Sequence, residues 1–427
     1  MRKIFLSVVG FSMICRLNAH AQVKQDSASN KPSSSLYNSP SQDSAKYNPR
    51  KLKLDEVDFV SSYYSQNGDH SAVTGGIGTE KVTDFANSIA LNFVWTNKHQ
   101  NKNTLAVGLG FDAHTAASQA YVSKTGASSP NGTRLYPSLD WTVENAKTGN
   151  TFGVGTYYST EYNYQSLGAD LHFSEKTDDK NGEFSAKLQG YFDHVTLIYP
   201  SEFNPMAIDI SSSNYGGGGH NHGNDDNNGS SPRETYSAAF GYTQIINSRL
   251  QIAFLADVVG QNGYLSLPFH RVYFTTGKDT IEKLPSSRFK LPLGFRLNYF
   301  WGDNIILRSY YRYYLDNWGI RSNTANLEVA YKVSPFFSIS PFYRFYNQSA
   351  ARYFAPYGEH SPTDQYYTSN YEYAKFSSQF FGVGFRIAPP NGVFGWQGLH
   401  ELEIRYGHYT QTTDLVSDVV SLSLGFK

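Results

Sequence analysis

The alternation of apolar and polar side chains at every second position is the feature that most constrains this chain. Side chains of a β-strand alternate between its two faces, so this period predicts strands with one apolar and one polar face. One parity is apolar in two neighbouring segments, over Phe85, Ile89, Leu91, Phe93 and Trp95 and then over Leu105, Val107, Leu109 and Phe111. The pattern recurs in segments 57–63, 135–143, 152–158, 167–173, 184–192, 236–242, 250–258, 291–301, 305–313, 327–333, 337–345, 379–387, 402–408 and 420–426.

The number and length of these segments indicate a membrane barrel. About 16 strands of roughly 9–11 residues match what a tilted strand needs to cross a bilayer. No run after residue 21 approaches the roughly 18 apolar residues of a membrane helix. Aromatic residues make up 16% of the chain, and Trp or Tyr repeatedly ends the apolar parity, as in interface girdles. A soluble β-sandwich or propeller also alternates, but this aromatic pattern is not typical of either.

The connections between the segments sort into two lengths. Short turns are expected near 97–103, 145–150, 175–182, 246–249, 302–304 and 334–336, with a medium one at 389–398. Longer loops are expected near 66–84, 116–133, 200–234, 260–287, 347–376 and 410–418. Such alternation is typical of outer-membrane proteins. We therefore predict an all-β fold: a single transmembrane antiparallel β-barrel of about 16 strands over residues 54–427, with short periplasmic turns and long extracellular loops.

The first 53 residues are predicted to be an export signal followed by a tether. Arg2 and Lys3 precede an apolar stretch, and Ala19-His20-Ala21 forms an A-x-A cleavage site, so residues 1–21 are expected to be a signal peptide. The only cysteine, Cys15, lies inside this segment, and its flanks fit a lipoprotein signal poorly. Residues 22–53 are rich in Ser, Asn, Gln and Lys and are expected to be a disordered periplasmic tether. The expected location is the outer membrane.

Several phrases of the chain resemble one known family. They include "RKLKLDEVDFVSSYYSQNGDH", "PFHRVYF", "YYRYYLDNWGIRSNTANLE" and "SPFYRFYNQSAARYFAPYGEH". These are similar to the family called domain of unknown function 3570, common in Bacteroidetes-type bacteria, over nearly all of residues 54–427. The resemblance implies an outer-membrane barrel and brings no reaction, ligand or catalytic residue with it.

The polar parity should line the barrel interior, and its charges are segregated along the chain. The predicted acidic lining residues come first, at Asp112, Asp140, Glu144, Asp170, Asp193 and Asp257. The predicted basic lining residues follow, at Arg296, Arg308, Arg312, Arg344, Arg386 and Arg405. An acidic wall facing a basic wall would orient dipolar solutes, which predicts a porin-like channel or transporter for small polar or charged solutes. Alternatively, the charges pair into a buried network, and the aromatic segment 263–274 folds inward and plugs the barrel.

Arg308 and Arg312 lie four residues apart on one predicted strand, about 13 Å at 3.3 Å per residue, and share a face. Guanidinium groups present planar forks to carboxylate or phosphate, so these residues, with Arg296 and Arg344, are candidates for an anion ladder. Structural pairing with Glu328 or Glu401 is the competing interpretation.

The run "GGGGHNHGNDDNNG" at 216–229 lies in the longest predicted extracellular loop. His220 and His222, with Asp225 and Asp226, could bind zinc, copper or nickel weakly, but two histidines are fewer ligands than a tight site needs, which favours a solvated loop. No other cofactor is indicated. The chain has no GxSxG, HExxH or phosphate-binding glycine motif, so no enzyme is predicted, and its zero net charge gives no sign of nucleic-acid binding. A further alternative is a non-conducting barrel that acts as an anchor or receptor for envelope proteins through its aromatic loops.

Overall fold

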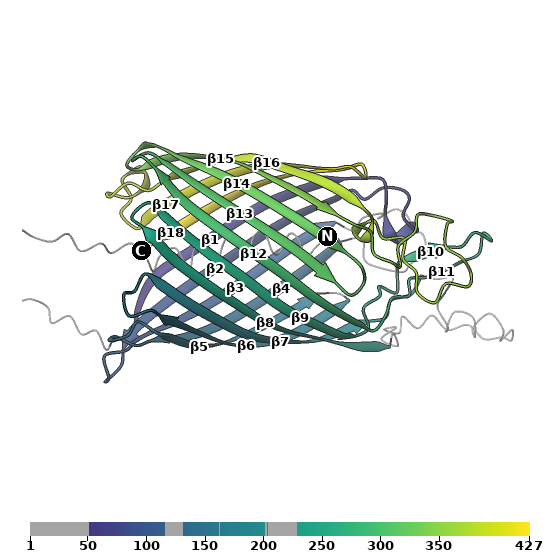
Figure 1. Cartoon of the computed structure of the whole chain (residues 1–427), viewed down its shortest axis with the longest axis horizontal. Helices are drawn as coiled ribbons and strands as arrows, with labels where there is room; N and C mark the ends of the chain where they lie inside the picture. The colour runs from purple at the N-terminus through teal and green to yellow at the C-terminus, as the bar shows by residue number, and fades with distance from the viewer. Residues whose placement is uncertain (1–50, 116–130, 162, 201–202, 204–228) are drawn as a thin grey trace, which may run out of the picture. The chain divides into compact units, whose positions relative to one another are not determined.

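The computed structural model describes residues 51–115, 131–161, 163–200, 203 and 229–427. In this part of the chain, sixteen antiparallel strands form one closed barrel (Figure 1), in which β1 pairs with β18 to complete the ring. The predicted fold and the expected number of strands are confirmed. No helix among these residues has the length and apolar character needed to span a bilayer.

The wall strands run in chain order around the ring. They are β1 (Lys53–Asn67), β2 (Val82–Thr96), β3 (Lys102–Thr115), β4 (Asn131–Glu144), β5 (Thr151–Glu161), β6 (Tyr164–Lys176), β7 (Gly182–Thr196), β8 (Ser230–Asn247), β9 (Leu250–Gly263), β12 (Ser287–Trp301), β13 (Ile305–Asp316), β14 (Arg321–Ser334), β15 (Phe337–Gln348), β16 (Phe376–Ile387), β17 (Leu399–Gln411) and β18 (Leu415–Phe426). Two short strands, β10 (Arg271–Tyr273) and β11 (Asp279–Ile281), form a separate sheet between β9 and β12.

The strands are longer than the sequence pattern predicts. The shortest wall strand, β5, has 11 residues and the longest, β8, has 18. The expected length was wrong because hydrophobic alternation marks only the part of a strand that faces lipid. Ladder pairing continues beyond it: residues 230–235 at the start of β8 are mostly polar and still pair with β7.

The two faces of the wall differ as the alternation requires. Tyr63 aligns with Phe85 on one side and with Val420 on the other, and all three side chains are exposed. Large exposed apolar side chains continue this exterior around the ring, for example Leu109, Leu188, Phe254, Tyr343 and Phe381. A continuous apolar exterior of this kind would be unstable in water and matches lipid. The barrel therefore spans a membrane.

Glycines make room for aromatic rings on the interior face. A Cβ on Gly407 would lie 2.5 Å from the ring of Phe380, and a Cβ on Gly382 would lie 2.8 Å from the ring of Phe342. At Gly407 a larger residue would displace the Phe380 ring, and at Gly382 it would also meet the backbone oxygen of Tyr406.

The connections at the two ends of the barrel differ, although less strictly than predicted. We call the end that carries the start of β1 and the end of β18 the turn end, and the opposite end the loop end. Turn-end connections are mostly tight, such as 248–249 and 335–336. At the loop end, 162–163, 317–320 and 412–414 are also short. The longer loop expected at 410–418 was wrong, since β17 and β18 pair up to Gln411 and Leu415.

Three loop-end segments interlock, and we call them the loop cap: residues 68–81, 264–286 and 349–375. Arg271 Nη1 donates to the Val73 carbonyl oxygen at 2.6 Å, and the His70 and Tyr371 rings stack at 3.8 Å. Thr368 Oγ1 donates to the buried Glu282 carboxylate at 2.5 Å. In Figure 1, β10 and β11 lie beyond the loop ends of the wall strands. The aromatic segment 263–274, which contains β10, therefore contributes to this cap.

Candidate functional site: the two interior walls

All the acidic and basic residues predicted to line the barrel lie on its interior face. Arg405 on β17 forms an ion pair of 2.6 Å with Glu328 on β14, although β15 and β16 separate these strands in the wall. Such a contact is possible only across the concave inside of the barrel. The acidic residues occupy β3, β4, β6, β7 and β9, and the basic ones occupy β12, β13, β15, β16 and β17. We call the interior of β3–β9 the acidic wall and that of β12–β17 the basic wall; the strand order places them on opposite arcs of the ring.

Neutral hydroxyl groups hold much of the acidic wall in place. Tyr136 donates to Asp112 at 2.6 Å, and Thr142 donates to Asp140 at 3.0 Å. Asp193 accepts from Ser166 at 2.7 Å and from Arg233 Nε at 2.8 Å. Glu144 lies near the turn end, where it aligns with Lys102 on β3.

Asp257 is the exception on this wall. Among the described residues it has neither a hydrogen bond nor an ion pair, and the nearest charge that acts on it is that of Arg312. It lies on β9, next to the first strand of the basic wall.

Asp170 is the centre of the acidic wall and has a fully buried side chain. It accepts hydrogen bonds from the Tyr157 hydroxyl and from His172 Nδ1, the latter at 2.9 Å, and Lys187 Nζ lies 3.3 Å away. With Asp140 and His172 it offers three donor atoms within 4.8 Å of one another, the spacing of a metal site. Both His172 nitrogens already have partners, however, because Thr142 Oγ1 lies 2.9 Å from Nε2. The ammonium group of Lys187 already supplies a positive charge 3.3 Å from Asp170, so we assign no metal here.

The turn-end half of the basic wall is paired. Glu328 bridges Arg308 at 2.7 Å and Arg405 at 2.6 Å, and Arg405 also contacts Glu403 at 2.9 Å. Nearer the turn end, Arg386 pairs with Glu401 at 2.7 Å. The contact of Arg308 with Glu328 is the pairing that the competing structural interpretation expects for this member of the predicted anion ladder.

The loop-end half of the basic wall is different, because the guanidinium groups of Arg312 and Arg344 have no carboxylate partner among the described residues. The Nε atom of each is buried without a hydrogen bond. Arg344 lies over the Phe380 ring at 5.9 Å, and Arg296 lies over the Tyr310 ring at 6.0 Å. Within the predicted anion ladder, the structure thus separates Arg308, which has a carboxylate partner, from Arg312 and Arg344, which have none among the described residues.

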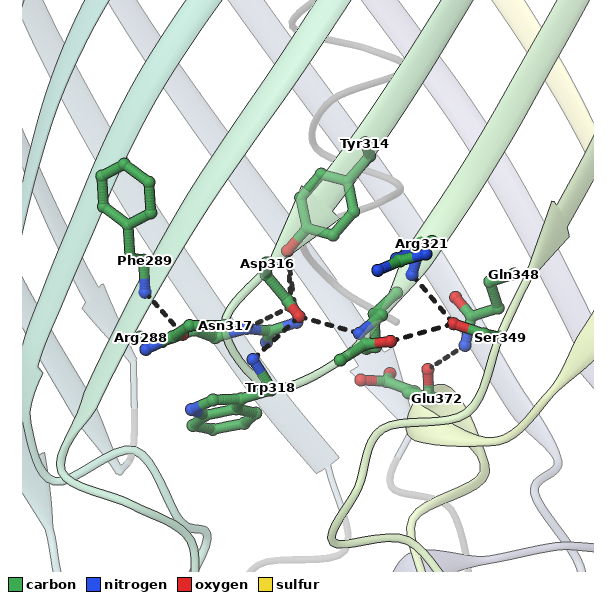
Figure 2. Close-up of polar contacts among 12 residues, drawn as sticks. Arg288, Phe289, Tyr314, Asp316, Asn317, Trp318, Arg321, Gln348, Ser349 and Glu372 are labelled. Atoms are coloured by element: carbon green, nitrogen blue, oxygen red, sulfur yellow. Dashed lines mark hydrogen bonds and ion pairs between the residues drawn. The ribbon is translucent and has the colours of Figure 1, made fainter.

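A polar cluster joins the rim of the basic wall to the loop cap (Figure 2). Asp316 accepts from Arg288 Nε at 2.9 Å and from the backbone N–H groups of Trp318 and Ile320 at 3.0 and 2.9 Å. The buried Trp318 ring lies 4.4 Å from the Arg288 guanidinium. Tyr373 of the cap lies over the same guanidinium, and burial raises the pKa of its hydroxyl to about 12. This hydroxyl is therefore neutral at physiological pH.

Gln348 makes a second link between the rim and the cap. Gln348 Nε2, at the end of β15, donates to the carbonyl oxygen of Glu372 at 2.9 Å (Figure 2) and to that of Ala374 at 2.6 Å. The cap is therefore fastened to the wall at β12, through Arg288, and at β15, through Gln348.

Sequence reasoning missed Arg233 and Arg288 because it placed Arg233 in the loop 200–234 and left Arg288 between the loop 260–287 and the apolar segment that begins at residue 291. Each lies near the loop-end start of a strand that begins earlier than its apolar stretch. The strand alternation was the available signal. Arg233 lies four residues before Ser237, and Arg288 lies two residues before Lys290, so each shares the interior face with that residue. His220 and His222 lie outside the described residues, so weak metal binding there stays a prediction.

Comparison with known proteins supplies a family and distant structural likenesses. A family model described as protein of unknown function (DUF3570) matches residues 23–417. No curated protein matches the sequence. Among solved structures, the outer membrane protein OprD from Pseudomonas aeruginosa is 10% identical with a TM-score of 0.42, covering 89% of this chain and 96% of that one. A BenF-like porin from Pseudomonas fluorescens Pf-5 is 6% identical with a TM-score of 0.40, covering 87% and 98%. A bacterial polysaccharide outer membrane secretin is 9% identical with a TM-score of 0.41, also covering 87% and 98%. The strand topology itself, rather than these likenesses, establishes the barrel.

Proposed function

The chain belongs to the family described as protein of unknown function DUF3570, and we propose that it forms a porin-like channel or transporter for small polar or charged solutes in the outer membrane. The observation that carries this proposal is the pair of oppositely charged walls on one barrel interior. A barrel of sixteen strands is of the size that encloses an aqueous interior unless loops fill it.

The walls would act on a solute through their field. Carboxylates on one arc and guanidinium groups on the other produce a potential gradient across the lumen, and low-dielectric walls strengthen it. A zwitterionic or dipolar solute gains energy by aligning with that gradient, whereas an apolar solute gains nothing and must displace water. The geometry therefore favours polar and charged solutes over apolar ones.

The orientation follows from the two ends. In outer-membrane barrels the short turns and the chain ends face the periplasm, and the longer loops face outward. The turn end is then periplasmic, and the loop cap is extracellular. Solutes would meet the cap first, then the unpaired arginines, and last the paired ones.

Conductance in planar bilayers tests the proposal. The full-length mature protein, folded into detergent and added to one side of the bilayer, is expected to produce discrete current steps that grow with salt concentration. Liposome swelling with neutral and zwitterionic solutes of equal size would then rank permeation. Absence of discrete steps at every voltage and salt concentration tested, from protein that is folded by heat-modifiable gel migration, would exclude the channel.

The loop cap favours a second candidate, a non-conducting barrel that anchors or receives an envelope partner. Its three segments hold one another in place and expose aromatic side chains such as Tyr357, which is 42% exposed. Exposed aromatic residues on an ordered surface are typical contact anchors. A barrel that is folded yet silent in bilayers would favour this candidate.

A further inference from the structure

The unpaired guanidinium groups of the basic wall are the least compensated charges on the barrel interior. Arg312 and Arg344 each have a buried Nε with no acceptor, and neither forms an ion pair within the described residues. Both residues are half-buried, and a buried N–H group that lacks an acceptor is costly, so protein interiors normally supply one. Arg308 and Arg405, on the same wall, have such partners. Arg312 and Arg344 therefore lack the carboxylate partners that Arg308 and Arg405 possess.

The strand register brings the guanidinium groups of Arg312 and Arg344 toward the same part of the barrel interior, beside β14. Arg312 on β13 aligns with Thr324 on β14, and Thr324 aligns with Tyr346, two residues beyond Arg344 on β15. With strands about 4.8 Å apart and a rise of about 3.3 Å per residue, the two Cα atoms lie about 12 Å apart along the wall. Both side chains project into the concave interior, which shortens the distance between their tips. Arg312 is close enough for its positive charge to act on Arg344.

The surroundings increase this positive charge instead of cancelling it. Arg405 also acts on Arg344, and Arg344 faces the Phe380 ring, which offers no acceptor oxygen. Thr324, between the two arginines, has a buried hydroxyl oxygen with no hydrogen-bond partner. Asp257 is the carboxylate whose charge acts on Arg312, and it forms no ion pair with it. The site thus presents two guanidinium groups against one distant carboxylate.

We infer that Arg312 and Arg344 form a binding site for a monoanionic carboxylate inside the barrel, with the Thr324 hydroxyl as an additional donor. A carboxylate accepts two parallel N–H bonds from a guanidinium fork, a geometry that a spherical halide cannot match. Arg312, Arg344 and Asp257 together carry one net positive charge, which one carboxylate balances, and the nearby Arg296 and Arg405 add to the attraction. This inference gives the channel of the proposed function a substrate class, but binding itself does not require conduction.

Anion-dependent thermal stability tests the site without relying on current. A ligand that binds only the folded state raises the unfolding midpoint in proportion to its occupancy. Full-length protein in detergent would be melted in sodium acetate, sodium phosphate or sodium chloride at equal ionic strength. Acetate is expected to raise the midpoint by at least about 2 °C over chloride.

The double variant Arg312→Gln/Arg344→Gln is expected to lose this acetate effect. Its midpoint in chloride should equal or exceed that of the unsubstituted protein, because it removes two uncompensated charges. Lys332→Gln removes one positive charge from an interior position near the turn end, away from the site, and should keep the acetate effect. The single variant Arg344→Gln serves as a second test if the double variant folds poorly, and it too should lose most of the shift.

Two results would show that the site does not exist. One is an acetate effect of equal size in the unsubstituted protein and the arginine variants; the other is no acetate effect in either. A larger shift with phosphate than with acetate would reject the monoanionic carboxylate. If the barrel gives no current in bilayers while acetate stabilises it through these arginines, the proposed channel is rejected and the inferred site is supported. If the barrel conducts but acetate has no effect, the inferred site is rejected and the proposed channel is supported.

Discussion

The acidic and basic walls both carry charged side chains inside the barrel, but these charges are balanced by different kinds of partner. Asp112 and Asp193 accept hydrogen bonds from Tyr136 and Ser166, so neutral side chains satisfy part of the negative charge. A guanidinium group needs several acceptors, and a hydroxyl such as that of Tyr314, which accepts from Arg288, brings no negative charge to balance it. The basic wall therefore depends on a few carboxylates, above all Glu328. No such carboxylate pairs with Arg312 or Arg344 among the described residues. Their N–H groups can therefore donate to an anion that enters the lumen.

The largest expected effect comes from breaking the acidic wall at its centre. Asp170→Asn removes the charge that Lys187, His172 and Tyr157 share, and should destabilise the barrel by about 2–4 kcal/mol. Asp257→Asn is the matched control, because Asp257 has no such partners among the described residues, and it should change stability by less than about 0.5 kcal/mol. Urea unfolding in lipid or detergent measures both. Equal losses in the two variants would show that hydrogen bonding does not distinguish the two carboxylates.

Breaking the basic wall at its bridge should have a smaller effect on stability and an additional effect on selectivity. Glu328→Gln leaves Arg308 and Arg405 without their shared charge; since Arg308 is 52% exposed, the expected loss is only about 1–2 kcal/mol. The same change frees positive charge in the lumen, so the reversal potential under a salt gradient should move toward anion preference. A shift toward cations would contradict the pairing.

The smallest effect is expected from comparing two arginines four residues apart on β13. Arg308→Gln removes a paired charge, whereas Arg312→Gln removes an unpaired one. Each should alter stability by about 0.5 kcal/mol or less. Arg312→Gln should lower anion preference in reversal-potential measurements more than Arg308→Gln does. Identical shifts would mean that the ion pair with Glu328 does not screen Arg308.

The number of strands and the interior position of the charged residues could be predicted because both depend on parity alone. Strand ends could not, since polar residues such as those at 230–235 pair in the ladder without facing lipid. The tight loop-end connection at 412–414 was missed for the same reason.

Pairing inside the barrel depends on register, which a single sequence leaves open. The alignment of Arg308 with Glu328 requires the β13–β14 register, and the contact from Arg405 to Glu328 requires closure of the ring. Sequence reasoning therefore placed Arg308 and Arg312 together, and the structure separates them by their partners.

The loop cap also constrains the order in which the protein can assemble. Arg271 and Val73 are 198 residues apart in sequence, and the stacked rings of His70 and Tyr371 belong to opposite ends of the barrel sequence. Bringing such distant segments together early would cost the most chain entropy, so these contacts are expected to form last. Because the loop after β1 meets the loop before β16, the cap spans the junction where β1 joins β18. Protease resistance of residues 264–286 would then appear only in molecules whose ring has already closed, which makes the cap a natural marker of completed folding.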